Sequence, residues 1–191
     1  MKKIAACFIF LAGFMIAVSP GLCKSKNLVY NGGLEHKKTE ELPSGWLTKI
    51  YRGTSAEFSF DDVEKHSGTY SYKIKIKPPG GCVLLYLDKN IDNITPGKSY
   101  QLTLWLKTQN IGYSPNFIAP AIRYNFGPGR ARIQPFPVID LMSEMKGVGG
   151  WKQLTMINKA PLGSKVITLD FMITKGTVWI DDVEIIEVSD Q

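Results

Sequence analysis

Short segments in which apolar and polar residues alternate follow one another through most of the chain. In residues 70–76, tyrosine or isoleucine fills every second position and serine or lysine fills the positions between them. Residues 56–60, 100–107 and 166–173 repeat this pattern. Side chains of a strand alternate between the two faces of a sheet, so each segment predicts a strand with one buried face. Turns rich in Gly, Pro, Asn and Asp separate the segments, and the succession predicts an all-β, two-sheet antiparallel β-sandwich.

The last segment, residues 176–186, is apolar or β-branched on both faces, which is typical of a strand covered by a second sheet. Two adjacent carboxylates, Asp181 and Asp182, nevertheless stand in its middle. A buried carboxylate requires a partner. Residues 27–35 form another apolar run, which turns at two glycines and ends on Glu35. If the two ends of the chain lie side by side, their acids could share a hard cation such as Ca²⁺, which takes six to eight oxygen ligands.

The region of about residues 111–147 departs from the alternating pattern. Five prolines fall between residues 115 and 137, and proline is excluded from the interior of strand ladders. One strand is expected over residues 118–126, followed by a basic loop at 127–132. Residues 138–146 have apolar positions near helical spacing and precede Gly147, which predicts one or two helical turns. We treat the region as an insertion.

The strand at residues 100–107 carries the most information about function. Tyrosine and leucine fill one face, whereas Gln101, Thr103, Trp105 and Lys107 fall on the other. A tryptophan among hydrogen-bonding side chains suits a sugar platform, since its ring offers an apolar surface to a pyranose and its neighbours meet the hydroxyl groups. The sequence therefore predicts a glycan groove centred on Trp105 and flanked by Gln101 and Lys107.

Further candidates for this groove come from other segments. The polar faces of the strands at 118–126 and 166–173 supply Arg123, Asn125 and Asp170. Trp46 follows a Pro-Ser-Gly turn, and either covers the core or forms one wall of the cleft.

The N-terminus has the three parts of a secretory signal peptide. Lys2 and Lys3 precede an apolar run over residues 4–18, which is short for a membrane span, and small residues follow. Cleavage is expected after Cys23 or Ser25. A lipid-modified Cys23 is the competing interpretation, but Leu22 stands where a lipoprotein signal requires a small side chain. We expect residues 1–23 to be a signal of bacterial type, residues 26–189 to be one domain, and the protein to be secreted or periplasmic.

Composition narrows the function further. The chain has 191 residues, of which 44% are hydrophobic and 21% charged, which is ordinary for one globular domain with a sizeable core. Of its three cysteines, only Cys82 lies beyond the signal. We therefore expect no internal disulfide, and we expect Cys82 to be a buried thiol. Loss of Lys2 and Lys3 lowers the formal charge from +6 to +4, and the remaining lysines are scattered, so nucleic-acid binding is not expected.

Most catalytic constellations are absent from the sequence. Beyond the signal there are two histidines, His36 and His66, and there is no Gly-x-Ser-x-Gly, His-Glu-x-x-His or paired Cys-x-x-Cys motif. A glycosidase needs only two carboxylates in one cleft, so Asp170 with a second acid stays open as an alternative. We expect no enzyme activity.

Six short motifs resemble those of the carbohydrate-binding modules of families 4, 9 and 22, in matching order and spacing. They are NGGLE at 31–35, PSGW at 43–46, HSGTYS at 66–71, PGKSY at 96–100, GW at 150–151 and WIDDVEI at 179–185. The resemblance implies a galactose-binding-like jelly roll, a structural Ca²⁺ and glycan binding without catalysis. It implies Asn31, Glu35 and Asp181 as calcium ligands, with Asp182 as the alternate to Asp181. It also implies a strand order that would bring Arg123, Asn125 and Asp170 onto the sheet of Trp105.

Together these patterns predict a secreted, monomeric, non-catalytic module that binds a polysaccharide or oligosaccharide in a groove on one sheet. The alternative is a structural or adhesive cell-envelope domain on the same scaffold. An open cleft around the predicted residues would favour glycan binding. If other parts of the chain cover these residues, they serve packing, which would favour the structural alternative.

Overall fold

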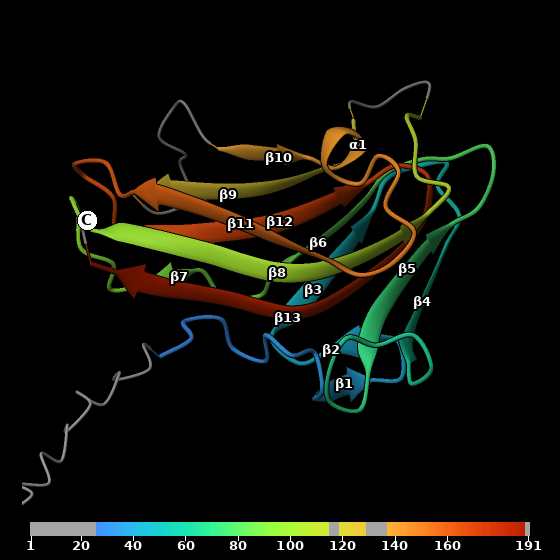
Figure 1. Cartoon of the computed structure of the whole chain (residues 1–191), viewed down its shortest axis with the longest axis horizontal. Helices are drawn as coiled ribbons and strands as arrows, with labels where there is room; N and C mark the ends of the chain where they lie inside the picture. Colours follow the sequence, from blue (N-terminus) through green and yellow to red (C-terminus); the bar gives the residue numbers. More distant parts are fainter. Residues whose placement is uncertain (1–25, 115–118, 129–136, 190–191) are drawn as a thin grey trace, which may run out of the picture.

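Two antiparallel sheets stacked as layers make up the fold (Figure 1). The computed structural model describes residues 26–114, 119–128 and 137–189, and the predicted signal peptide lies outside them. The five-stranded sheet has the order β11 (Lys152–Lys159), β8 (Ser99–Gln109), β13 (Gly176–Val188), β5 (Ser71–Ile76) and β4 (Ala56–Asp61). The six-stranded sheet has the order β10 (Val138–Asp140), β9 (Ala121–Gly127), β12 (Val166–Ile173), β6 (Val83–Leu87) and β3 (Trp46–Ile50), with β7 (Ile91–Asp92) also paired to β12. The predicted all-β jelly-roll sandwich is confirmed.

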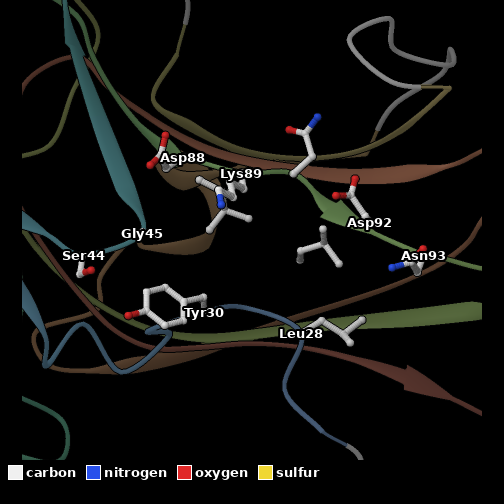
Figure 2. Close-up of a pocket in the computed structure, with 11 residues that line it drawn as sticks. Leu28, Tyr30, Ser44, Gly45, Asp88, Lys89, Asp92 and Asn93 are labelled. Carbon is white, nitrogen blue, oxygen red and sulfur yellow. The ribbon is translucent and has the colours of Figure 1, made fainter.

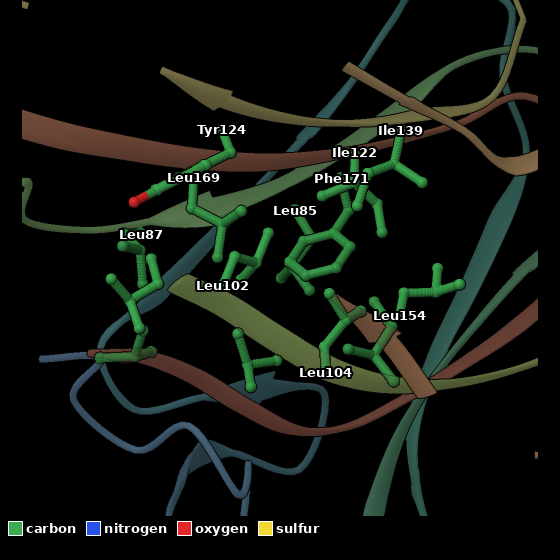
Figure 3. Packing of buried hydrophobic residues seen from close by; sticks show 14 of the residues in the cluster. Leu85, Leu87, Leu102, Leu104, Ile122, Tyr124, Ile139, Leu154, Leu169 and Phe171 are labelled. Carbon is green, nitrogen blue, oxygen red and sulfur yellow. The ribbon is translucent and has the colours of Figure 1, made fainter. Parts of the chain in front are cut away.

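The core lies between the two sheets, and the alternation read from the sequence supplies it. Leu102 and Leu104 of β8 are fully buried and face Leu169 and Phe171 of β12 in the space between the layers (Figure 3). Every second residue of these strands points inward, so the intervening residues form the outer face of each sheet. Each sheet therefore presents one outer face on which a ligand could bind.

The two ends of the described chain lie side by side. The ladder between β13 and β8 is irregular between Asp181 and Glu184, where Asp182 has a φ of 48°. At this bulge the Val183 amide donates to Gly32 O at 2.8 Å, and the Leu28 amide donates to Ile185 O at 2.8 Å. A bulge releases backbone groups from a ladder, and here the N-terminal segment uses them.

The region predicted to be an insertion contributes two strands to the six-stranded sheet. Strand β9 lies inside the sheet between β12 and β10, and β10 forms the edge. Of the one or two helical turns predicted within residues 138–146, one is present as α1 (Leu141–Glu144), whereas Val138–Asp140 is a strand that pairs with Arg123–Ala121. Asp140 caps α1 by accepting from the Met142 amide at 2.9 Å. A free edge on β9 offered hydrogen bonds that outweighed a weak helical period.

Three smaller features complete the description. A two-stranded sheet, β1 (Lys37–Thr39) and β2 (Leu42–Pro43), lies beside the N-terminal segment. Cys82 is a buried free thiol, as expected. No helix within residues 26–114, 119–128 and 137–189 is long and apolar enough to cross a bilayer.

Trp46 belongs to the core and does not form a rim of an external cleft. Its side chain is 0% exposed, its ring centroid lies 5.9 Å from that of Phe171, and its Nε1 donates to Asn31 O at 3.3 Å. The side chain at the first position of β3 points into the core between the two sheets. The turn before Trp46 left two interpretations open, and the structure supports the core position.

Trp46→Ala should lower the free energy of unfolding by about 3–5 kcal/mol, because it leaves a large cavity beside Phe171. Trp46→Phe should cost less, because it retains a ring in the core. Chemical denaturation of both variants measures the difference. An alanine variant as stable as the wild type would contradict the core position.

Candidate functional site

The residues predicted to bind glycan lie on two different outer faces. Gln101, Trp105 and Lys107 are on β8 of the five-stranded sheet, whereas Arg123 and Asn125 on β9 and Asp170 on β12 belong to the six-stranded sheet. The expectation that one sheet carries all six is therefore wrong. Alternation assigns a residue to a face of its own strand, but strand pairing decides which sheet that strand joins.

On the five-stranded sheet, one face of the Trp105 indole is already covered. The His66 ring stacks on it with centroids 3.7 Å apart and planes inclined by 14°. His66 Nδ1 lies 2.7 Å from Asp182 Oδ2, and Ser67 Oγ donates to Asp182 Oδ1 at 2.8 Å. A cavity of about 270 Å³ beside Trp105 is lined by Thr103 and other polar residues.

The polar neighbours of Trp105 are engaged within the protein. Lys107 Nζ pairs with Glu64 Oε2 and lies 5.7 Å from the centroid of the Trp179 ring. Gln101 Nε2 donates to Thr103 Oγ1 at 3.0 Å. These bonds would have to rearrange before either side chain could meet a sugar hydroxyl.

A second cluster on this face is built around Asp61. Its Oδ2 accepts from Trp179 Nε1 at 2.9 Å and from Lys73 Nζ at 3.1 Å, and its Oδ1 accepts from the amides of Val63 and Glu64. Burial acts to raise the pKa of Asp61, but the hydrogen bonds from Glu64, Trp179, Lys73 and Val63 together outweigh it and lower the pKa to about 2. The cluster stabilises the end of β4 against β5 and β13.

The pKa of Asp61 in the fold lies below its ordinary value of 3.8, so its contribution to stability is complete above about pH 4 and is lost as the pH falls through about 2. Asp61→Asn should cost about 2 kcal/mol of unfolding free energy at neutral pH. The penalty should shrink toward pH 2. Urea denaturation across this range, with the adjacent exposed Asp62→Asn as control, measures it. A penalty independent of pH would contradict the assignment.

On the six-stranded sheet, the register aligns a row of side chains across five strands. The row runs through Leu47, Tyr86, Asp170, Arg123 and Val138. Asp170 is 5% exposed, and its Oδ1 pairs with Arg123 Nε. The row thus places an aromatic ring beside a charge-assisted pair on one outer face.

A cavity of about 320 Å³ lies against this row at Tyr86 and Asp170. It is lined by side chains of three neighbouring strands and the loop after β6: Lys49, Leu84, Tyr86, Asn90, Thr168 and Asp170. Apolar and hydrogen-bonding groups therefore alternate around one hollow, as at sites for small polar molecules.

Thr168, which lines this cavity, and its ladder neighbour Asn125 carry polar atoms without partners in the described part of the chain. Asn125 and Thr168 face each other across the β9/β12 ladder, on the same face as Arg123 and Asp170. Asn125 is 0% exposed, and within the described residues both of its amide atoms and Thr168 Oγ1 lack hydrogen-bond partners. An unsatisfied buried polar group costs about 1–3 kcal/mol, so such atoms call for a water or a ligand.

Tyr86 and Leu84 were missed by the sequence interpretation. Residues 82–87 read as a short apolar strand, and no polar residue marks its outer face. Alternation opposite Val83, Leu85 and Leu87 was the available signal. Alternation places Tyr86 on the outer face, but it does not show which polar residues lie beside the ring until the neighbouring strands are known.

Two of the predicted calcium ligands converge on one loop. Glu35 Oε1 accepts from the Thr69 amide at 2.9 Å, and Asp181 Oδ2 accepts from the amides of His66 at 2.9 Å and Ser67 at 3.1 Å. Between these contacts, a Cβ at Gly68 would lie 1.9 Å from Glu35 Oε1, so only glycine fits. Asp181 is 0% exposed, and burial raises its pKa although the amide hydrogen bonds act in the opposite direction.

Asn31 does not join this pair. Its Nδ2 donates to His36 O and Ser44 O, both at 2.9 Å, and its Oδ1 accepts from the His36 amide at 3.0 Å. Asp182, the alternate ligand, bonds His66 and Ser67. The described residues contain no group of three or more His, Cys, Asp or Glu placed to hold a metal. Glu35 and Asp181 suit a hard cation in chemistry, and any further ligands would be amide or hydroxyl side-chain, backbone or water oxygens.

Comparison with known proteins places the fold among carbohydrate-binding modules. No protein-family profile matches the sequence, and no curated protein sequence matches it. The structure is similar to the family 61 module TmCBM61, solved with β-1,4-galactotriose, with a TM-score of 0.54 and 17% identity over 86% of this chain and 100% of that one. It is similar to a family 4 module, with a TM-score of 0.54 and 15% identity over 84% of this chain and 99% of that one.

A longer protein contains the same fold. The enzymatically active domain of tailspike protein 4 from bacteriophage CBA120 matches with a TM-score of 0.62 and 16% identity. The match covers 85% of this chain but only 21% of the tailspike chain. These likenesses establish a jelly-roll sandwich shared with carbohydrate-binding modules.

Proposed function

We propose that the domain is a non-catalytic carbohydrate-binding module, which binds an oligosaccharide or polysaccharide on the outer face of the six-stranded sheet. The observation that carries the proposal is the cavity lined by Tyr86, Asp170 and Thr168. Arg123 pairs with Asp170. Asn125 lies opposite Thr168 across the β9/β12 ladder, and both of these residues have polar atoms that lack partners among the described residues. The fold shared with carbohydrate-binding modules supports it.

The chemistry of this face suits a sugar. A pyranose has apolar C–H faces and hydroxyl groups that both donate and accept hydrogen bonds. Tyr86 and Leu84 supply apolar surface in the cavity, and Lys49 supplies a donor. The amide of Asn125 and the hydroxyl of Thr168 supply unused donors and acceptors. A bound sugar would offset the cost of burying those atoms without partners.

The Trp105 face is the second candidate for the same function. Its indole and the 270 Å³ cavity remain compatible with one sugar ring. His66 covers part of the indole, and Gln101 and Lys107 are engaged elsewhere, so this face offers fewer available groups.

Hydrolysis is not part of the proposal. A glycosidase of the common type requires two carboxylates in one cleft. At the Tyr86 cavity the described residues supply one carboxylate, Asp170, which is paired with Arg123, whereas Asp88 and Asp92 line the neighbouring larger cavity and not this one.

Tyr86→Ala should weaken retention on the polysaccharide that the wild type binds by roughly 30-fold, because loss of a binding hot spot costs about 2 kcal/mol or more. Its melting temperature should change little, since Tyr86 is only partly buried. Trp105→Ala should retain binding. Pull-down on a panel of insoluble polysaccharides and thermal melting measure both properties.

The reverse result would identify the other face. Loss of binding in Trp105→Ala and not in Tyr86→Ala would move the site to the five-stranded sheet. A wild-type protein that binds no glycan would favour the structural or adhesive alternative.

We also propose that the domain functions outside the cytoplasm as a monomer. The basic start and apolar run of residues 2–18 support export.

A structural Ca²⁺ between Glu35 and Asp181 is a further part of the proposal. Both carboxylates hold the loop of residues 66–70, and both are hard oxygen donors. The cation would neutralise the buried charge of Asp181 and lock the loop to β13.

Saturating Ca²⁺ should stabilise the protein by roughly 2.7 kcal/mol at a hundred times its dissociation constant, which raises the melting temperature by about 5–10 °C over a chelated sample. Glu35→Gln and Asp181→Asn should abolish this difference, whereas Asn31→Ala should retain it. Melting with and without chelator tests all four proteins. Equal melting temperatures of the wild type in both conditions would contradict the calcium site.

A further inference from the structure

A larger cavity lies beside the proposed glycan face. It has a volume of about 590 Å³ and is enclosed by the N-terminal segment, the turn at Ser44 and Gly45, and the chain from Leu87 to Asn93 (Figure 2). None of the sequence predictions involved this region. Its volume falls within the range of small-molecule sites.

An exposed aromatic ring stands at one end of this cavity. Tyr30 is 64% exposed, and its ring lies directly on the backbone of Gly45, where a Cβ would come within 2.4 Å of Tyr30 Cδ1. Gly45 has a φ of 83°, and its carbonyl accepts from the Asp88 amide at 2.9 Å. A fixed turn thus supports one part of the ring and leaves the rest exposed toward the cavity (Figure 2).

The lining is amphipathic. Leu28, Leu87 and Ile91 supply apolar surface. Asp88 and Asn90 contribute polar side chains, as do Asp92 and Asn93, and none of these four forms a side-chain hydrogen bond or ion pair with other described residues. Two carboxylates against the one ammonium of Lys89 favour neutral sugars over acidic ones.

This cavity and the one on the six-stranded sheet share two lining residues. Leu87, the last residue of β6, and Asn90, in the loop that follows, line both. A chain bound over Tyr86 would therefore reach the larger cavity by passing Asn90.

We infer that the two cavities form one extended site for a neutral oligosaccharide chain, whose end packs against Tyr30. The inference rests on the proposed function and specifies its ligand: a chain of several sugar units. Affinity should then rise with chain length until both cavities are filled, because each added unit gains contacts.

The test uses soluble cello-, xylo- and β-1,4-galacto-oligosaccharides, from disaccharide to hexasaccharide, titrated by calorimetry into the whole domain. The wild type should bind the longest member of the preferred series at least about tenfold more tightly than the shortest. Tyr30→Ala should remove this gain and leave the affinity for the short member unchanged. Tyr30→Phe should retain the gain, as should Leu162→Ala, which alters an exposed apolar residue outside both cavities.

The outcomes separate the two proposals. If the wild type binds these sugars with the same affinity at all lengths, or if Tyr30→Ala keeps the full gain, the extended site is wrong and the proposed function stands. If the wild type binds no sugar in any series, both fail. Loss of short and long binding together in Tyr30→Ala would also overturn the extension, because it would place Tyr30 at the primary site.

Discussion

The fold depends on the way a buried carboxylate is accommodated in the middle of its last strand. Asp181 is fully buried, and its oxygens are met by the amides of His66, Ser67 and Asp182. An uncompensated charge at this depth would be costly, so the loop of residues 66–70 is held in place by the need to satisfy it. The bulge after Asp181 also frees the backbone groups of Val183 to receive the N-terminal segment. One acid therefore joins three parts of the chain that are far apart in sequence.

That arrangement bears on where a ligand can bind. The loop of residues 66–70, which binds Asp181, also carries His66 over the Trp105 indole. The same loop therefore covers the aromatic ring from which the sequence predicted the glycan groove. Among the described residues no ring stacks on Tyr86 of the opposite sheet, which lines a cavity, and the polar groups of that face include atoms without partners.

Strands β9 and β10 shape the second face. Strand β9 supplies Arg123 and Asn125, and β10 extends the sheet beyond them. The comparison structures share the sandwich at low identity. The chemistry of this surface must therefore be judged from the side chains of this chain, and the fold alone does not assign a ligand.

Much of the fold could be predicted because it depends on local alternation. The period of two along residues 70–76, 100–107 and 166–173 places their apolar side chains in the core, whatever strand lies next to them. The apolar ends of the chain, each with an acid, led to the expectation that Glu35 and Asp181 share a cation. The structure shows that both accept hydrogen bonds from backbone amides of the loop of residues 66–70.

Only the tertiary structure decided which strands share a sheet. Alternation placed Trp105, Arg123 and Asp170 on outer faces correctly. It could not say which sheet each face belongs to, because strand pairing decides that. The same limit hid Tyr86, which gains Asp170 as a neighbour only through the β6/β12 ladder. Trp46, with two open interpretations, entered the core because β3 directs its first side chain toward Phe171. Pairing and register are long-range properties, so the sequence determined the strands and their faces, whereas the binding surface arose from contacts between distant segments.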